Sequence, residues 1–354
     1  MNTAPVRSIR AEGDVVITLD QTRLPFEEHW LTLAGEADCD RAIRTMQVRG
    51  APLIGAVGAY GLAFALRQDA SDTGLVAACA RLELARPTAV NLHWALERVR
   101  SHVAPLPTGN RAQAAWAEAQ RLCDDDVACN RAIGEHLLSV LPRASVAGRP
   151  LQILTHCNAG RLATVAYGTA LAPIYLLHER GIAVHVWVDE TRPRNQGASL
   201  TAWELAERGI AHTVIADNAG GLLMMRGDVD AVIVGCDRVT RNGDVVNKVG
   251  TYLKALAAHA HGVPFFVACP ISTIDMRLAD GLQVPIEDRD GRELSHVTGI
   301  DAQGRQHTVD IMPGAQRVAN PAFDITPAAL VTALVTERGA CRASAGSLAN
   351  LAAA

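Results

Sequence analysis

Three short apolar runs in the second half of the chain each end on polar or reactive side chains. The runs and the residues that follow them are LQILT (151–155) before His156 and Cys157, IAVHVWV (182–188) before Asp189 and Glu190, and AVIVG (231–235) before Cys236 and Asp237. Such runs, rich in β-branched residues and separated by helix-length segments, are typical of parallel strands joined by crossover helices. Ligands bind outside the carboxyl ends of the strands in such sheets. The sequence therefore predicts an active site at that edge.

The second half of the chain has the periodicity of an α/β fold with an open, doubly wound parallel sheet. We expect strands near 151–155, 182–188, 211–216, 231–235 and 264–268, and helices near 161–179, 197–208, 219–226 and 248–261. The looser segment 281–315 is expected to close over the site. A last helix is expected over 326–338, with Pro327 in its first turn, and the final ten residues are expected to be frayed.

The first part of the chain has a different pattern. Residues 14–33 indicate two or three short strands, and Cys39 to Leu141 has the composition and breaks of several helices. The segment at 142–150 has the composition of a linker, and 354 residues suffice for two cores. We predict a smaller, mainly helical N-terminal domain with short strands, residues 1–145. A Rossmann-like domain, residues 146–354, would carry the catalytic residues.

Charge and cysteine content narrow the range of partners and compartments. The formal net charge is −4, without the basic excess that nucleic-acid or membrane-surface binding needs. Eight cysteines are scattered without a disulfide framework, which indicates free thiols in a reducing cytosol. The N-terminus has no apolar core typical of a signal peptide, and the longest nearly uncharged stretch, 51–66, is too short to span a bilayer. We expect a cytoplasmic protein that binds neither nucleic acid nor membrane.

Cys157 and Asp237 are the candidates for catalysis. Cys157 lies between a predicted strand and a predicted helix, where the helix N-terminus and nearby arginines would favour the thiolate. A buried, inert thiol is the alternative. Asp237 follows an apolar strand, and desolvation there would raise its pKa so that the carboxyl stays protonated and can donate. Its alternative is a salt bridge with Arg238 or Arg241.

Candidate residues for binding a small anionic substrate lie in both parts of the chain. They are Arg49, Gly50, Ala51, Arg86, Gln196, Asn247 and Lys248. Gly50 would let the backbone approach an oxyanion that Arg49 grips. Lys248, at the start of a predicted helix, would stand beside free N–H groups that suit a phosphate. Gln196 is placed to hydrogen-bond a sugar hydroxyl.

Metal-ligand patterns are weak. His259 and His261 lack a second pair at ligand spacing, and the adjacent His156 and Cys157 cannot point to one site on a strand. The sequence contains no Walker loop, GxSxG elbow or zinc-ribbon pattern. We expect neither a metal nor another cofactor.

Collinear segments along nearly the whole chain resemble the methylthioribose-1-phosphate isomerases, the aldose–ketose isomerases of methionine salvage. The segments are VRGAPLIGAVGAYG (48–61), RPTAVNL (86–92), NRAIGEH (130–136), LTHCNAG (154–160), VDETRPRNQGASLTAWEL (188–205), DNAG (217–220), VGCDRVTRNGDVVNKVGTY (234–252), PISTID (270–275) and NPAFDITP (320–327). The wider superfamily includes ribose-1,5-bisphosphate isomerase and the regulatory subunits of translation initiation factor 2B, which share the fold without chemistry.

The resemblance implies roles for individual residues. The family's catalytic cysteine in the THCN motif falls on Cys157, and its catalytic aspartate in the G-x-D-R motif falls on Asp237. Its substrate-binding positions fall on Arg49, Gly50, Ala51, Arg86, Gln196, Asn247 and Lys248. It also implies a homodimer through the sheet domain and a small sugar phosphate as substrate. The local departures, which bear on substrate preference, are Ala159, Asn195, Ser199 and Cys236.

The implied reaction converts 5-methylthioribose 1-phosphate to 5-methylthioribulose 1-phosphate. Phosphate on the anomeric oxygen prevents spontaneous ring opening, so an acid must protonate the ring oxygen, and we assign this step to Asp237. Hydrogen then moves from C2 to C1, either as a proton, with Cys157 as base, or as a hydride, with Cys157 stabilising charge. The sequence is consistent with both routes.

Other functions are also consistent with the fold. A related isomerase would act on ribose 1,5-bisphosphate, which needs a second anion site, or on 5-deoxyribose 1-phosphate. A non-catalytic regulatory subunit would bind sugar phosphates or nucleotides and partner proteins. The presence of both Cys157 and Asp237 favours an enzyme, because a binding module needs neither.

Overall fold

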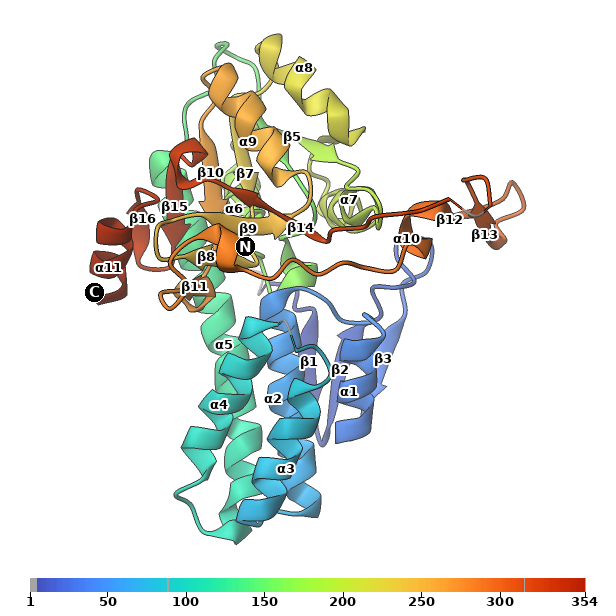
Figure 1. Cartoon of the computed structure of the whole chain (residues 1–354), viewed down its shortest axis with the longest axis vertical. Coiled ribbons are helices and arrows are strands. Elements are labelled where there is room, and N and C mark those ends of the chain that lie inside the picture. The colour runs from blue at the N-terminus through green and yellow to red at the C-terminus, as the bar shows by residue number, and fades with distance from the viewer. Residues whose placement is uncertain (1–4, 88, 315, 354) are drawn as a thin grey trace.

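The computed structural model describes residues 5–87, 89–314 and 316–353 (Figure 1). Thr88, in the RPTAVNL segment, lies outside them. The chain begins with an antiparallel sheet of β1 (Ile9–Glu12), β2 (Val15–Leu19) and β3 (Trp30–Leu33). The helices that follow are α1 (Glu36–Arg44), α2 (Ala51–Gln68), α3 (Asp72–Glu83), α4 (Val90–Val103) and α5 (Thr108–Val140). Strands followed by helices are what the sequence predicts for this part.

Helix α2 is the centre of the first core. Its residues from Leu53 to Leu66 are all buried, and Pro52 lies in its first turn. A Cβ at Gly58 would overlap the Leu92 side chain of α4, and one at Gly61 would crowd Cys39 and Leu82. Small residues on this helix therefore allow its neighbours to approach closely, which is a packing role.

The larger sheet has the strand order β16-β15-β10-β7-β4-β5-β6. Its strands are β4 (Leu151–Thr155), β5 (Val184–Asp189), β6 (His212–Ile215), β7 (Ala231–Val234), β10 (Phe265–Ala268), β15 (Ala333–Thr336) and β16 (Gly339–Cys341). All are parallel to their neighbours except β16, which is antiparallel to β15. From β4 the chain winds outward through β5 and β6, and from β7 it winds the other way through β10. The direction therefore reverses between β4 and β7, where ligands bind in such sheets.

Helices cover both faces of this sheet, because successive strand residues point to opposite sides. Ile153 and Ile233 pack with the end of α5 and with α6 (Ala172–Glu179) and α7 (Ala202–Glu207). Leu154 and Val234 pack with α8 (Gly220–Met225), α9 (Thr251–Ala260) and α11 (Ala345–Ala353). The mixed α/β class and the five predicted strands are thus confirmed.

The predicted helix over 326–338 is wrong. The segment contains the end of strand β14 (Phe323–Thr326), a short 3-10 turn at Ala328–Leu330, and strand β15. Leu334 and Val335 are fully buried between β10 and β16, so sheet pairing decided the conformation of a short apolar run. The expectation of a frayed C-terminus is also wrong, since α11 anchors there through the buried Leu348.

The predicted helix over 161–179 is α-helical only from Ala172, in α6. The residues before it form an irregular, buried segment with a short 3-10 turn at Arg161–Ala163. A bridge between Gly160 and Gly168 closes this segment, and Gly168 has a φ of 76°. Glycine tolerates that left-handed backbone, which a continuous helix would exclude.

A smaller sheet lies beside the carboxyl ends of the central strands, in the order β11-β8-β9-β14. Its other members are β8 (Arg238–Thr240), β9 (Val245–Lys248) and β11 (Ile274–Asp275). Asn247 and Lys248 therefore lie on a strand, and the prediction that they begin a helix is wrong. A β8–β9 hairpin, turned by Gly243 with a φ of 95°, postpones α9 to Thr251.

After α10 (Arg292–Ser295), β12 (His296–Ile300) and β13 (Gln306–Asp310) form a hairpin that extends from the body (Figure 1). Residues 141–150, between α5 and β4, form neither helix nor strand, and the predicted domain boundary falls in this segment. The last turns of α5, with Ile133 and Leu137, nevertheless pack in the sheet core. Among the described residues, no helix is long and apolar enough to cross a bilayer.

Candidate active site

A cavity of about 280 Å³ lies where β4 and β7 end. The residues that the sequence analysis selected all line it: Arg49, Gly50, Ala51, Arg86, Cys157, Gln196, Asp237, Asn247 and Lys248. Cys157 and Asp237 follow adjacent strands, so the sheet itself brings them to one cavity. This proximity is observed, and the chemical role of each residue stays a prediction.

Asp237 is open to the cavity but surrounded by protein on its other sides. Burial raises the pKa of its carboxyl, against the opposing effect of Lys248, Arg86 and the more distant cations. The direction is the one expected for a group that donates a proton near neutral pH. The alternative of a salt bridge is not realised among the described residues, where Asp237 forms an ion pair with neither Arg238 nor Arg241 and Arg238 instead pairs with Asp275 at 3.8 Å.

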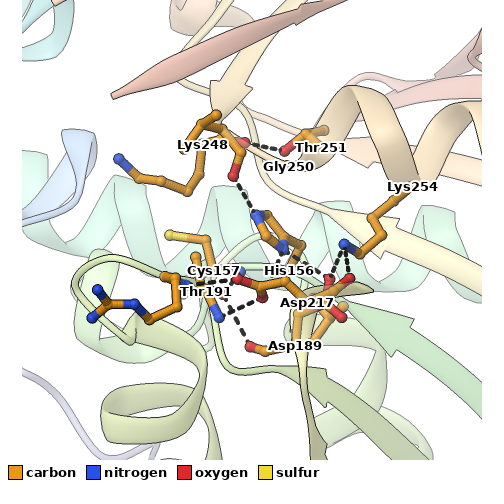
Figure 2. Close-up of polar contacts among 12 residues, drawn as sticks. His156, Cys157, Asp189, Thr191, Asp217, Lys248, Gly250, Thr251 and Lys254 are labelled. Carbon is orange, nitrogen blue, oxygen red and sulfur yellow. Dashed lines mark hydrogen bonds and ion pairs between the residues drawn. The ribbon is translucent and has the colours of Figure 1, made fainter. Parts of the chain in front are cut away.

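Cys157 is held in a left-handed conformation, with a φ of 66°. Its backbone N–H donates to Thr191 Oγ1 at 2.8 Å, and its carbonyl accepts from Thr201 Oγ1 at 2.7 Å. The predicted effect of a helix N-terminus on the thiol is wrong, because no α-helix begins directly after it. A cation is supplied instead by Lys248, whose side chain points to the same side as the thiol (Figure 2).

Lys248 is itself fixed inside the cavity wall. Its Nζ donates to the Ala322 carbonyl at 2.8 Å and lies 4.6 Å from the centre of the Phe323 ring. Burial lowers the pKa of Lys248, and the neighbouring Cys157 and Asp237 oppose that shift. A cation held in this way has little freedom to leave the cavity.

The loop after Cys157 is organised by the fully buried Glu204 of α7. Its carboxylate accepts from the Asn158 amide, from the Arg161 N–H at 2.8 Å and from the Tyr175 hydroxyl at 2.6 Å. A Cβ at Gly160 would overlap this carboxylate, so the loop can approach it only with glycine there. No sequence signal indicated this role for Glu204, since its partners are far apart in the chain.

Arg49 joins the first core to this loop. Its guanidinium donates to Asn158 Oδ1 at 2.7 Å and to the Asn158 carbonyl at 2.8 Å. Both bonds go to the protein itself, so the bidentate grip of an oxyanion by Arg49 stays a prediction.

Gly50 makes a close approach, and the partner is the loop after Cys157. Its φ is 92°, and a Cβ there would overlap the Ala163 backbone. We expect Gly50→Ala to lower the free energy of unfolding in urea by about 1–3 kcal/mol, because the strained backbone and the overlap both oppose it. Gly109→Ala is the matched control, since Gly109 lies in α5 with open space around it. An effect of Gly50→Ala within about 0.5 kcal/mol of the control would contradict this account.

Arg289 is a cavity residue that the sequence analysis missed. It comes from the segment predicted to close over the site, and Val284, Pro285 and Glu287 of that segment also line the cavity. Its side chain is 11% exposed and pairs with Glu287 at 3.2 Å. The surrounding acidic residues of the sequence IEDRDG concealed it as a candidate cation.

Arg86 stands near Arg289 on the same cavity. Burial, and next the charge of Arg289, lowers the pKa of Arg86. One of its terminal guanidinium nitrogens is buried and has no hydrogen-bond partner in the part of the chain that the structure describes. Gln196, which is 6% exposed, likewise has a buried side-chain oxygen without such a partner. Both residues line the cavity, and each keeps one buried polar atom without a partner among the described residues.

Comparison with known proteins places this chain in a family. The model of the initiation factor 2 subunit family matches residues 47–343. The chain belongs to this family. Among its relatives, the methylthioribose-1-phosphate isomerase of Methylobacterium nodulans is 57% identical over 352 residues, which cover 98% of this chain and 96% of the relative. The resemblance identified from the sequence is confirmed.

Two solved structures of the family are similar along nearly the whole chain. The 5-methylthioribose 1-phosphate isomerase from Pyrococcus horikoshii OT3 has a TM-score of 0.87 and 38% identity, covering 99% of this chain and 96% of its own. The translation initiation factor eIF-2B subunit delta from A. fulgidus has a TM-score of 0.80 and 39% identity, covering 95% and 96%. Proteins named as isomerases and proteins named as initiation-factor subunits therefore share this fold, and only the residues of the cavity can distinguish the two functions.

Proposed function

We propose that this chain is an aldose–ketose isomerase of methionine salvage, which converts 5-methylthioribose 1-phosphate to 5-methylthioribulose 1-phosphate. The observation that carries the proposal is a thiol and a carboxyl of raised pKa on one cavity, at the ends of adjacent strands. The relative from Methylobacterium nodulans, named for this activity, supports the choice of substrate.

Asp237 acts as the general acid, and donates its proton to the ring oxygen as the furanose opens. Cys157 then acts in one of two ways. As a thiolate it removes the hydrogen of C2 as a proton and returns it to C1 through an enol-type phosphate. If hydride moves directly from C2 to C1, the thiolate only stabilises the charge that develops. In both routes the C2 hydroxyl gives its proton to the Asp237 carboxylate as the ketone forms, which restores the acid. Lys248 lies beside both groups and balances negative charge in either route.

The remaining cavity residues hold the substrate. Arg86 and Arg289 bind the phosphate, because an unpaired guanidinium N–H and two neighbouring cations suit a dianion. The unpaired side-chain oxygen of Gln196 accepts a hydrogen bond from a sugar hydroxyl. The rest of the substrate pocket is formed by Arg49, Gly50, Ala51 and Asn247.

The apolar part of the cavity suits a thioether. Its lining includes Met46, Ile54, Val90 and Val284, which exclude water and match a methylthio group. One observation favours the related substrate ribose 1,5-bisphosphate. A neighbouring pocket shares Arg49 and Gln196 with the cavity and is also lined by arginines, namely Arg192, Arg194 and Arg292.

A turnover assay on three sugar phosphates tests the proposal. Purified protein is mixed with 5-methylthioribose 1-phosphate, 5-deoxyribose 1-phosphate or ribose 1,5-bisphosphate, and ketose formation is followed by ³¹P NMR. We expect the methylthio sugar to give a kcat/KM roughly tenfold or more above that of the bisphosphate. A reversed preference would assign the related substrate. No turnover of any of the three would favour a non-catalytic subunit, such as the solved structure from A. fulgidus is named for.

Arg289→Gln is expected to raise the KM for the sugar phosphate roughly 10- to 100-fold, because a hydrogen bond to a charged group contributes about 1.5–3 kcal/mol. The kcat is expected to change much less, since the phosphate does not react. Arg305→Gln, on the exposed hairpin, is the matched control, because its charge lies outside the cavity. An unchanged KM in Arg289→Gln would remove Arg289 from the phosphate site.

We further infer that residues 1–145 and 146–354 form two domains, the second Rossmann-like, that the chain forms a homodimer through the sheet-bearing part, and that it works in the cytoplasm. The family resemblance supports the dimer, and the linker-like composition of 142–150, with its prolines, glycine and alanines, supports the boundary. Sedimentation equilibrium at micromolar concentration would measure the mass of the assembly directly.

A further inference from the structure

Behind Cys157 lies a buried polar network that the mechanism has not used. Its centre is His156, whose side chain is 1% exposed. His156 lies beside Asp189 (Figure 2), and its Nδ1 is 2.8 Å from Asp189 Oδ2. On the other side of the ring, His156 Nε2 lies 2.8 Å from the Val249 carbonyl oxygen. Lys254 Nζ lies 3.1 Å from the same Asp189 oxygen.

These partners define the charge of the ring. The Val249 carbonyl oxygen can only accept, so Nε2 must carry a hydrogen. Asp189 Oδ2 already faces the Lys254 ammonium and is therefore an ionised acceptor, so Nδ1 must donate as well. We therefore assign a hydrogen to each ring nitrogen, which gives the His156 ring a positive charge.

The network also contains Asp217, whose Oδ1 lies 4.0 Å from His156 Nδ1. One ligand atom from each of His156, Asp189 and Asp217 lies within 4.8 Å of the others, the spacing of a metal site. Here Lys254 supplies the cation, because its Nζ pairs with Asp189 and donates to the Asp217 carbonyl. The Asp189 carboxylate thus lies against two basic side chains, His156 and Lys254, and the Asp217 carboxylate lies near His156.

Two connections link this network to the cavity. The Asp217 carboxylate accepts from the backbone of Thr191 at 2.7 Å, and Thr191 Oγ1 in turn accepts from the Cys157 N–H at 2.8 Å. The second connection is the Val249 carbonyl, which directly follows Lys248.

The turn after Val249 is shaped to the His156 ring. Gly250 has a φ of 105°, and a Cβ there would lie 2.8 Å from ring atoms of His156. A glycine is therefore required for the ring to reach the Val249 carbonyl. The imidazolium joins the loop that carries the thiol to the strand that carries the ammonium.

We propose that His156 is a positioning residue, a buried imidazolium that holds Cys157 and Lys248 in register and places positive charge behind the thiol. This proposal depends on the proposed function at one point, namely that Cys157 is the reactive thiol of the site. A neutral side chain at position 156 would break the contact to Val249 or to Asp189. It would also leave the carboxyl groups of Asp189, Asp217 and Asp324 facing Lys254 alone, and this excess negative charge in a poorly solvated site would disfavour the thiolate.

The charges that surround these groups come from several elements. Those that face His156 are Asp189 after β5, Asp217 after β6, Lys254 on α9 and Asp324 on β14. His156 itself reaches the cavity lining, and the other titratable groups that share the cavity with Cys157 are Arg49, Arg86, Cys236, Asp237, Arg238, Lys248, Glu287 and Arg289. Replacing His156 changes the charge balance only among the residues that face it.

Alkylation of Cys157 measures the effect without any sugar phosphate. Full-length protein is treated with iodoacetamide between pH 6 and pH 10, and modification of the Cys157 peptide is quantified by mass spectrometry. In His156→Asn and His156→Gln the midpoint of the rate–pH profile is expected to move up by at least about half a pH unit. Turnover is expected to fall roughly tenfold or more. Lys254→Gln removes the other cation and should move the midpoint in the same direction.

His136→Asn is the matched control. His136 also bonds a backbone carbonyl, that of Thr336 at 2.9 Å, but it does not line the cavity. We expect its alkylation profile and turnover to match those of the unmodified protein. If the Cys157 profile is unchanged in the His156 variants, the proposal is overturned whatever the turnover. If those variants do not fold, an unchanged profile in Lys254→Gln overturns it. Because the readout needs no substrate, it separates failure of this role from failure of the proposed isomerase activity.

Discussion

Asp237→Asn is expected to lower kcat roughly 100- to 10,000-fold while the protein stays folded, because an amide of the same size cannot deliver a proton to the ring oxygen. The KM is expected to change little, since the cationic residues of the cavity remain. Steady-state kinetics with 5-methylthioribose 1-phosphate measure both quantities. A kcat within about threefold of the unmodified protein would remove Asp237 as the general acid.

The same variant should be more stable than the unmodified protein at neutral pH. Burial raises the pKa of Asp237 in the folded chain, so between the unfolded and folded values the folded state holds more protons than the unfolded state. In that window the stability contributed by this carboxyl falls as the pH rises. Asparagine does not ionise, so it makes no such pH-dependent contribution to stability. Its stabilising effect should therefore appear at neutral pH and vanish below about pH 4, where both states hold the proton. Urea unfolding at the two pH values tests the sign.

Cys157→Ala is the second change of large effect. Removing the thiolate is expected to lower kcat roughly 100- to 10,000-fold if it acts as the base. The left-handed backbone at this position is retained by the bonds to Thr191 and Thr201, so the fold should persist. Near-normal turnover would return Cys157 to the alternative of an inert thiol.

The control for this change is Cys341→Ala, at a half-buried cysteine of β16 outside the cavity. It should leave kcat within about twofold of the unmodified protein. Substrate deuterated at C2 then distinguishes the two routes in the unmodified enzyme. Loss of deuterium to solvent supports proton transfer with Cys157 as base, whereas complete retention favours a hydride shift in which Cys157 stabilises charge.

The location of the site was predictable because parallel strands impose it. Cys157 and Asp237 are 80 positions apart in the sequence, yet each follows a strand with an unmistakable apolar run. Once the strands are assigned, the sheet brings their carboxyl ends to one edge. The two residues follow β4 and β7, which are direct neighbours at the point where the winding reverses.

Features that depend on distant partners were not predictable in this way. The segment that became β15 is a short apolar run, and only pairing with β10 and β16 made it a strand. Arg289 was concealed among acidic residues in a loop, where no periodicity applies. The role of His156 depends on Asp189 and Lys254, which reach it from other elements.

The most direct test is a crystal structure of Asp237→Asn with 5-methylthioribose 1-phosphate, because the slow variant should retain its substrate. We predict the phosphate within hydrogen-bond distance of Arg86 and Arg289, and the furanose between the Cys157 thiol and the side chain at position 237. A sugar phosphate bound in another pocket, or a thiol and a position-237 side chain that face different ligand groups beyond reach of C2 and the ring oxygen, would contradict the account.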